Sequence, residues 1–247
     1  MPEKITLYTA KVCPYAHRVE LALEEVGAPY EPYQIDLQNK PEWYAPQINP
    51  ASKVPAVAYG GPPTSPDKPS PESTKIAESL VLLEFVADLY PNSHLLPKDP
   101  VLRAKARFFI DAVGTKLNPK FFALVMRGEP GAGEGLLQGI EEIQKLLPEE
   151  GKGKYAVGDV YTIADAAITP FLARMEVAIK NDLGAFEPGE GTKVYEKLQG
   201  DPKYARFRKY LDDVKARPSF QKTFDEGYLV EAYRKRYEPA RAQKKND

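Results

Sequence analysis

The sequence predicts an α/β domain in residues 1–90 and an all-α domain in residues 101–247. Strand and helix patterns alternate through the first part, whereas only helical periodicity follows Val101. Residues 91–100 contain three prolines and are typical of a linker. A chain of 247 residues is long enough for two modest domains with sizeable cores.

The first domain is expected to run strand, helix, strand, helix, strand, strand, helix. The strands are predicted at Lys4–Ala10, Tyr30–Asp36, Val54–Tyr59 and Thr74–Ala77. The helices are predicted at Pro14–Val26, from about Pro41, and from Ser79, whose hydroxyl can cap the last one. Residues 60–73, with five prolines, predict an extended surface segment. This order favours a thioredoxin-like fold.

The second domain is expected to be a bundle of helices. They are predicted at Arg103–Val125, Leu136–Leu147, Thr162–Met175, Tyr204–Lys215 and Ser219–Tyr237. Asn118-Pro119 should kink the first of these, because proline cannot donate a backbone hydrogen bond. Thr162 and Asp165 have the spacing of a capping box at a helix start.

The composition excludes several classes of function. Thirty-four basic and 35 acidic residues leave a net charge of −1, which argues against nucleic acid and anionic membranes as partners. One cysteine excludes an internal disulfide and a cysteine-based zinc site, and two histidines far apart in the sequence argue against a histidine-based metal site. The chain begins with a charged strand and has no apolar run of membrane length. We therefore expect a cytoplasmic protein without a metal.

Cys13 lies where the first strand ends and the first helix begins. Pro14 suits the first helical position, so Cys13 falls at or near the N-cap, facing unpaired backbone N–H groups. Lys11 and Arg18 add positive charge nearby. Such a position can lower the pKa of a cysteine from about 8.5 to roughly 3.5–7.5. Cys13 is therefore a candidate nucleophile, although a lone cysteine is more often an inert buried residue.

The motif Cys13-Pro14-Tyr15-Ala16 has alanine where a second cysteine would resolve a mixed disulfide. An external thiol must then resolve any mixed disulfide formed on Cys13. This monothiol arrangement points to a small thiol cosubstrate, and glutathione is the obvious candidate.

Four motifs together resemble a cytosolic glutathione transferase of the omega class, of the fungal type. They are Cys13-Pro14-Tyr15-Ala16-His17-Arg18, Asn39-Lys40-Pro41-Glu42-Trp43, Lys53-Val54-Pro55 and Glu78-Ser79. The resemblance covers nearly the whole chain. It implies a thioredoxin-like glutathione-binding domain and a helical substrate-binding domain. It also implies a homodimer with a role in detoxification.

The resemblance also implies how glutathione is held. Val54-Pro55, with a cis proline, would offer its backbone to the cysteinyl part of glutathione. Glu78 would meet the ammonium of the γ-glutamyl group and Ser79 its carboxylate, while Lys40 would meet the glycyl carboxylate. Taken singly, these residues could instead be surface charges, a helix cap and a turn proline.

A cysteine nucleophile implies a particular chemistry. Cys13 would form a mixed disulfide with glutathione, so the resemblance implies thiol transferase, dehydroascorbate reductase-like or glutathionyl-ketone reductase activity. We expect a hydrophobic pocket between the domains for aromatic second substrates. Its candidate residues are Tyr15, Phe122, Met126, Arg174 and Tyr210, each of which could equally be an ordinary core residue. Two other functions stay open, namely a non-catalytic protein that sequesters hydrophobic aromatic molecules and a structural module of a larger assembly.

Overall fold

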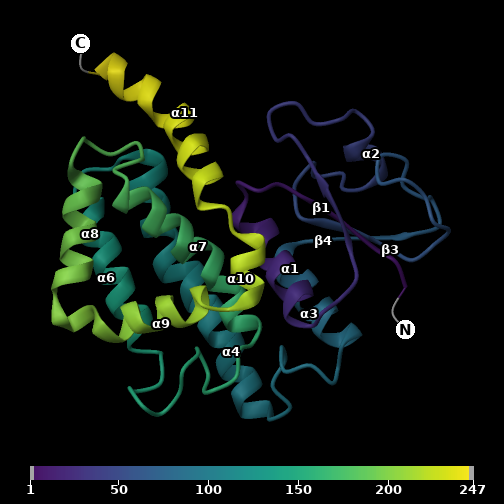
Figure 1. The fold of residues 1–247 in the computed structure, drawn as a ribbon, viewed down its shortest axis with the longest axis horizontal. Helices are drawn as coiled ribbons and strands as arrows, with labels where there is room; N and C mark the ends of the chain where they lie inside the picture. Colours follow the sequence, from purple (N-terminus) through teal and green to yellow (C-terminus); the bar gives the residue numbers. More distant parts are fainter. Residues whose placement is uncertain (1–2, 245–247) are drawn as a thin grey trace. The chain divides into compact units, whose positions relative to one another are not determined.

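The structure, a computed structural model, describes residues 3–244, so residues 1, 2 and 245–247 of the two expected domains lie outside it. The chain divides into two compact units, Met1–Leu96 and Pro97–Asp247 (Figure 1). The first unit contains a sheet with helices and the second is helical. This confirms the predicted order of an α/β part followed by an all-α part.

A four-stranded mixed sheet in the order β2-β1-β3-β4 is the frame of the first unit. β1 pairs parallel with β2 and antiparallel with β3, and β4 pairs antiparallel with β3. The strands are β1 (Ile5–Thr9), β2 (Glu31–Gln34), β3 (Ala56–Tyr59) and β4 (Thr74–Ala77). Each lies within the range predicted for it, and β3 begins only after Pro55, which cannot donate to the ladder.

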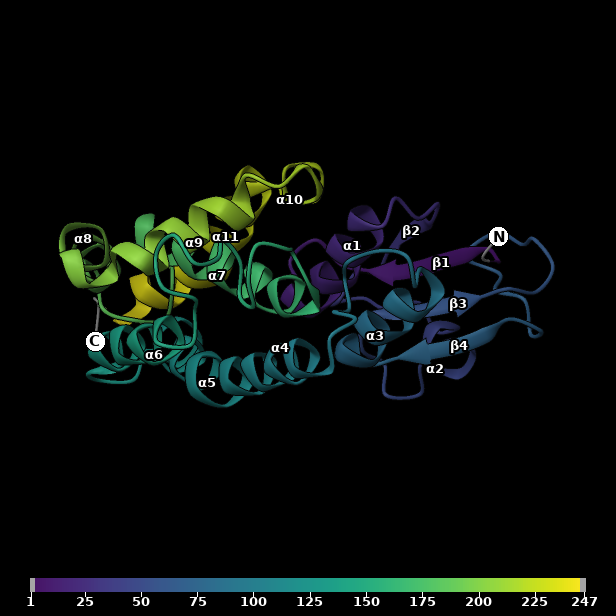
Figure 2. The ribbon, with the colours of Figure 1, turned by 90° about the horizontal axis from the view of Figure 1, so that it is seen from below.

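Helices cover both faces of this sheet. Thr9 Oγ1 donates a hydrogen bond of 2.6 Å to Glu20 on α1 (Pro14–Glu25). The ring of Tyr8 lies 5.8 Å from that of Tyr44 on α2 (Tyr44–Gln47). Because successive strand residues point to opposite faces, α1 and α2 lie on opposite sides of β1. The third helix of this unit, α3 (Ser79–Leu89), packs beside α1 (Figure 2).

The proline-rich segment, residues 60–73, is attached to the sheet. The buried Tyr8 hydroxyl donates to the carbonyl of Pro66 at 2.8 Å, and Lys4 Nζ donates to the carbonyl of Thr64 at 2.9 Å. Burial raises the pKa of Tyr8 to about 12, so the hydroxyl remains a donor at neutral pH. The segment thus lies on the α2 side of β1.

The second unit is built from helices around a buried central one. The elements are α4 (Pro100–Ala112), the π-helical turn η1 (Val113–Leu117), α5 (Asn118–Phe122), the π-helical turn η2 (Ala123–Arg127), α6 (Ala132–Gln144), α7 (Ile163–Lys180), α8 (Glu190–Gly200), the short 3₁₀ turn η3 (Pro202–Tyr204), α9 (Ala205–Lys215), α10 (Pro218–Thr223) and α11 (Glu226–Lys244). α7 is buried along nearly its whole length and packs against α4, α8, α9 and α11 (Figure 1). Within residues 3–244, every helix is too short or too polar to cross a bilayer.

The start of α7 carries the predicted capping box. Thr162 Oγ1 accepts from the Ala164 N–H at 3.2 Å, and Asp165 Oδ2 accepts from the Thr162 N–H at 2.9 Å. Around Pro119, where the sequence predicts a kink, two π-helical turns flank α5. Proline lacks an N–H donor, so a local change of helical register is a way to continue past it.

Several helix boundaries differ from the predictions. The first long helix begins at Pro100, inside the expected linker, because the Asp99 carboxylate accepts from two N–H groups of its first turn. α6 begins at Ala132, and its Gly133 packs so closely on α8 that a Cβ would lie 2.8 Å from Val194. α8 was not predicted. The predicted helix Ser219–Tyr237 is two helices, α10 and α11.

Candidate active site

Cys13 lies at the junction of β1 and α1, as the sequence predicts. Its backbone is extended, with φ −82° and ψ 116°, and it is the N-cap of α1, with Pro14 at the first helical position. Its sulfur makes no capping hydrogen bond and lies 3.8 Å from the carbonyl oxygen of Val54. The N-terminus of α1 therefore faces the same space as the loop before β3, and the partial positive charge there favours the anionic form of a thiol.

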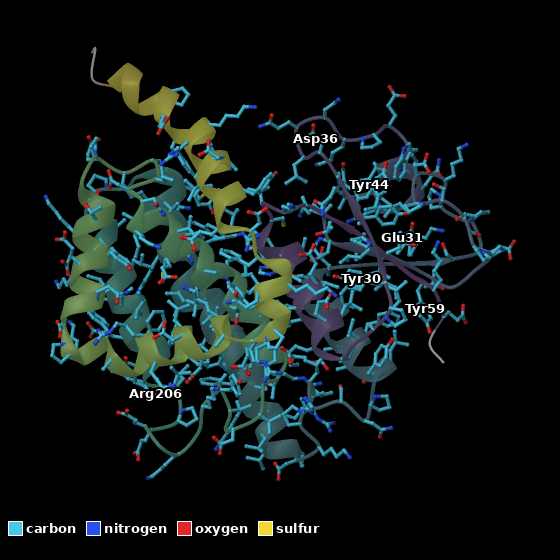
Figure 3. All side chains as sticks on the ribbon, viewed as in Figure 1. Tyr30, Glu31, Asp36, Tyr44, Tyr59 and Arg206 are labelled. Carbon is cyan, nitrogen blue, oxygen red and sulfur yellow. The ribbon has the colours of Figure 1, made fainter. Side chains whose placement is uncertain are left out.

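The loop before β3 is held by hydrogen bonds to its carbonyl groups. The peptide bond between Val54 and Pro55 is cis. The carbonyl of Lys53 accepts from the Tyr44 hydroxyl at 2.7 Å and from the side-chain amide of Asn49 at 2.8 Å. Tyr44 lies against the sheet of the first unit (Figure 3), and burial raises the pKa of its hydroxyl, which therefore stays a donor.

The second loop that borders this space leads into α3. Glu78 precedes the helix with φ +74°, a backbone conformation that residues other than glycine rarely adopt. Ser79, the first residue of α3, is 6% exposed, and its Oγ accepts a hydrogen bond of 3.1 Å from Nη1 of Arg18. Glu78 and Ser79 thus place a carboxylate and a hydroxyl at a helix N-terminus, where anions bind readily.

Cys13, the loop before β3 and the start of α3 border one pocket of about 500 Å³, a size typical of small-molecule sites. It is lined by Cys13, Tyr15, Leu37, Lys40, Asn49, Ser52, Lys53, Val54, Pro55, Glu78 and Ser79. All of these residues belong to the first unit. The structure therefore brings together all seven site residues that the sequence predicts in this unit. The lining offers two ammonium groups, one carboxylate and one thiol, which suits a ligand that carries charges of both signs.

The comparisons with known proteins agree with this geometry. Residues 7–94 match the family described as "Glutathione S-transferase, N-terminal domain". Glutathione transferase Omega 1C from Trametes versicolor is 55% identical, with a TM-score of 0.90, and the match covers 96% of this chain and 97% of that one. The chain belongs to the glutathione transferase family.

Two further relatives widen the comparison. Glutathione transferase Omega 2S from Trametes versicolor, solved in complex with 2,4-dihydroxybenzophenone, is 44% identical with a TM-score of 0.87, over 94% of this chain and 99% of that one. A probable maleylacetoacetate isomerase from Caenorhabditis elegans is 32% identical over 67% of this chain and 75% of its own length. The protein is thus a glutathione-dependent transferase of the omega class, with a thioredoxin-like first unit and a helical second unit.

The candidate second-substrate residues of this glutathione transferase have different environments. Tyr15 is 39% exposed and lines the pocket beside Cys13, and Met126 on η2 is 37% exposed. Phe122 on α5 packs its ring 6.3 Å from that of Phe171 on α7. Tyr15 and Met126 are thus exposed, and Phe122 is partly buried. Their role in binding a second substrate stays a prediction.

The other two candidates are buried in the second unit. Arg174 on α7 is 2% exposed, donates to the carbonyl of Pro170 at 3.1 Å and lies 5.8 Å from the ring of Phe224. Tyr210 on α9 is 0% exposed, and its hydroxyl donates to Asp165 at 2.8 Å. The environment of Tyr210 favours a role in packing over contact with a ligand. Its assignment as a substrate residue also stays a prediction.

Four pocket residues were missed by sequence reasoning, namely Leu37, Asn49, Ser52 and Lys53. Asn49, Ser52 and Lys53 lie next to the Val54-Pro55 motif, and that proximity was the signal that could have found them. Lys40 Nζ donates to the carbonyl of Ser52 at 2.7 Å, so the predicted anion-binding lysine is held at the pocket wall. Among residues 3–244, there is no cluster of three metal-ligating side chains.

Proposed function

We propose that this transferase acts as a thiol transferase and reductase through a mixed disulfide between Cys13 and glutathione. The observation that supports it is the single pocket that holds Cys13 together with Lys40, the Val54-Pro55 loop and Glu78-Ser79. The proposal extends the general activity of the family to a cysteine-based reaction. Its substrates would be disulfides, dehydroascorbate or glutathionyl ketones.

The proposed reaction consists of two thiol–disulfide exchange steps. The Cys13 thiolate attacks the glutathione sulfur of a mixed disulfide, the sulfur–sulfur bond breaks, and the substrate leaves as a thiolate. The thiolate of a second glutathione then attacks the glutathione sulfur on Cys13, which regenerates the Cys13 thiolate and releases glutathione disulfide. With a glutathionyl ketone, the first attack breaks the bond between the glutathione sulfur and the carbon next to the carbonyl, the electron pair leaves as the enolate of the ketone, and that carbon then takes up a proton.

Residues of the pocket would orient glutathione for this attack. Glu78 would pair with the ammonium group, Ser79 and the N-terminus of α3 with the neighbouring carboxylate, and Lys40 with the glycyl carboxylate. The backbone beside Pro55 would pair with the cysteinyl residue as an added strand does. Because Cys13 Sγ lies 3.8 Å from the Val54 carbonyl, a cysteinyl residue paired there would bring its sulfur close to Cys13.

The Cys13→Ser variant tests this proposal. We expect it to lose glutathione-dependent reduction of a mixed disulfide and to keep binding glutathione, since serine preserves the size and position of the side chain. Trp43, the one tryptophan, packs against the same core cluster as Cys13, so its fluorescence can report binding. Full turnover in Cys13→Ser would refute the cysteine mechanism, and the wild-type protein measured in parallel is the control.

A second candidate function is the sequestration of planar aromatic molecules. The Omega 2S relative was solved with 2,4-dihydroxybenzophenone, and this chain is 44% identical to it. We propose that this transferase also binds such molecules, with Tyr15, which lines the pocket of the first unit, as a contact. Tight binding of 2,4-dihydroxybenzophenone with negligible reduction of any disulfide would favour sequestration over catalysis.

We also propose that the protein is a homodimer and works in the cytoplasm. The dimer is an expectation from the omega class, and the cytoplasm supplies the reduced glutathione that a monothiol mechanism consumes. Light scattering on the purified protein tests the first part. A mass of one chain across a range of concentrations would refute it.

A further inference from the structure

Arg18 supports the pocket from behind without lining it. It lies on α1 after Cys13, is 4% exposed, and is absent from the residues that line the pocket. Its guanidinium donates to Ser79 Oγ at 3.1 Å and lies 5.2 Å from the centre of the Tyr15 ring. One buried cation therefore connects the helix of the candidate nucleophile, α1, with the start of α3.

The hydrogen bond from Arg18 determines how Ser79 can serve a ligand. A guanidinium group has only donors, whereas a serine hydroxyl has one proton and two lone pairs. Ser79 must therefore accept from Arg18, and its own proton is directed elsewhere. Because Ser79 lines the pocket, this proton is available to a ligand there. The ligand atom that it meets must then be an acceptor.

The positive charge of Arg18 also affects which ligand atom can bind at Ser79. Burial lowers the pKa of Arg18 to about 10, so the group remains a cation at neutral pH. Charge-assisted hydrogen bonds are roughly twice as strong as neutral ones. A cation behind Ser79 and the positive end of α3 in front of it both favour an anionic acceptor.

We propose that Arg18 is a positioning residue that fixes the Ser79 hydroxyl as a donor and so makes this subsite selective for a carboxylate. This inference rests on the proposed function, in which Ser79 meets the α-carboxylate of the γ-glutamyl group. It adds a residue that touches no ligand and acts through Ser79. It also predicts that the site binds more weakly a glutathione analogue whose α-carboxylate is an amide, because the amide is neutral.

Dissociation constants for glutathione and for this amide analogue test the proposal, measured from Trp43 fluorescence. A hydrogen bond to a charged group corresponds to about 10–100-fold in affinity, so the wild-type protein should prefer glutathione by that factor. Arg18→Met and Ser79→Ala should each weaken glutathione binding about tenfold or more and weaken amide binding by only a few-fold, because a hydrogen bond to a neutral acceptor contributes less than one to a carboxylate. The double variant should bind glutathione no more weakly than either single variant, because the two residues act as one unit.

The controls separate this role from a structural one. Lys4→Met removes a cation of the same unit that lies outside the pocket lining, and it should leave the selectivity unchanged. Arg18→Lys keeps the positive charge but lacks the planar guanidinium with its fixed N–H donors. It should therefore retain part of the preference for glutathione over the amide. If Arg18→Met fails to fold, Arg18→Lys and Ser79→Ala still provide the comparison.

Different outcomes overturn different claims. Equal losses for glutathione and the amide in Arg18→Met, or fully additive losses in the double variant, would show that Arg18 only supports the fold. Those results would leave the proposed function intact. A wild-type protein that binds neither compound would overturn both proposals, and full turnover in Cys13→Ser would overturn the cysteine mechanism while leaving the carboxylate selectivity in place.

Discussion

Replacing Tyr210 by phenylalanine removes one hydrogen bond from a carboxylate that has no contact with solvent. Asp165 is 0% exposed and accepts from the Ala156 N–H, from both donors of Thr162 and, at 2.8 Å, from the Tyr210 hydroxyl. Burial raises the pKa of Asp165 from 3.8 to about 6, against the lowering effect of these hydrogen bonds. Burial also raises the pKa of Tyr210, so its hydroxyl donates throughout the working pH range.

The stability that Tyr210→Phe removes depends on pH. At pH 8 Asp165 is ionised, and a hydrogen bond to a charged group contributes about 2 kcal/mol, whereas at pH 5 the carboxyl is protonated and the bond contributes about 1 kcal/mol. Because the folded-state pKa of Asp165 is raised, its protonated form stabilises the fold fully below about pH 4, and this contribution is lost as pH rises through 6. Tyr210→Phe raises that pKa further and extends the loss to higher pH.

Urea unfolding followed by circular dichroism measures the effect at both pH values. We expect Tyr210→Phe to lower the free energy of unfolding by about 2 kcal/mol at pH 8, or about 4–8 °C in melting temperature, and by about half as much at pH 5. Tyr204→Phe is the matched control. Its ring is equally buried, but its hydroxyl donates to the partly exposed Glu141 at 3.0 Å, so its effect should be smaller. A loss that is equal at both pH values, or unchanged stability with a raised KM for the second substrate, would refute the reasoning.

Three further predictions concern the pocket and the assembly. Glu78→Gln should weaken glutathione binding by about 10–100-fold, because it removes the proposed partner of the ligand ammonium, and unchanged affinity in a calorimetric titration would contradict this role. Lys40→Met should weaken binding by only a few-fold, since the Lys40 ammonium already donates to the carbonyl of Ser52 and a single lysine pairs with a carboxylate through a flexible point charge, and a loss of tenfold or more would contradict this. Light scattering should give the mass of two chains, and a single-chain mass would exclude the homodimer.

Sequence reasoning found those parts of the site that local patterns encode. The place of Cys13 follows from a strand pattern, a proline at the first helical position and a helix pattern, all within a short stretch. The Thr162–Asp165 capping box is local in the same way and is confirmed. The fold class followed from the order of such elements. Together these local signals were sufficient to predict where α1 and α7 begin.

The remaining features depend on contacts between distant parts of the chain. Arg18 and Ser79 are 61 residues apart, and no local pattern indicates that they share a hydrogen bond. The burial of Tyr210 depends on α7 and α9 packing together, so its sequence neighbourhood could not distinguish a core residue from a pocket residue. α8 was missed because its sequence is polar and is bordered by glycines, which weaken helix signals.

The proposed mechanism needs a reactive sulfur at residue 13 that exchanges with glutathione, and intact-mass measurement after incubation with oxidised glutathione tests this most directly. We expect an adduct of one glutathione per chain, reversed by a reducing agent and absent in Cys13→Ser. Because Cys13 is the one cysteine of the chain, no other residue can form such an adduct. A wild-type protein that stays unmodified under these conditions would contradict the central claim.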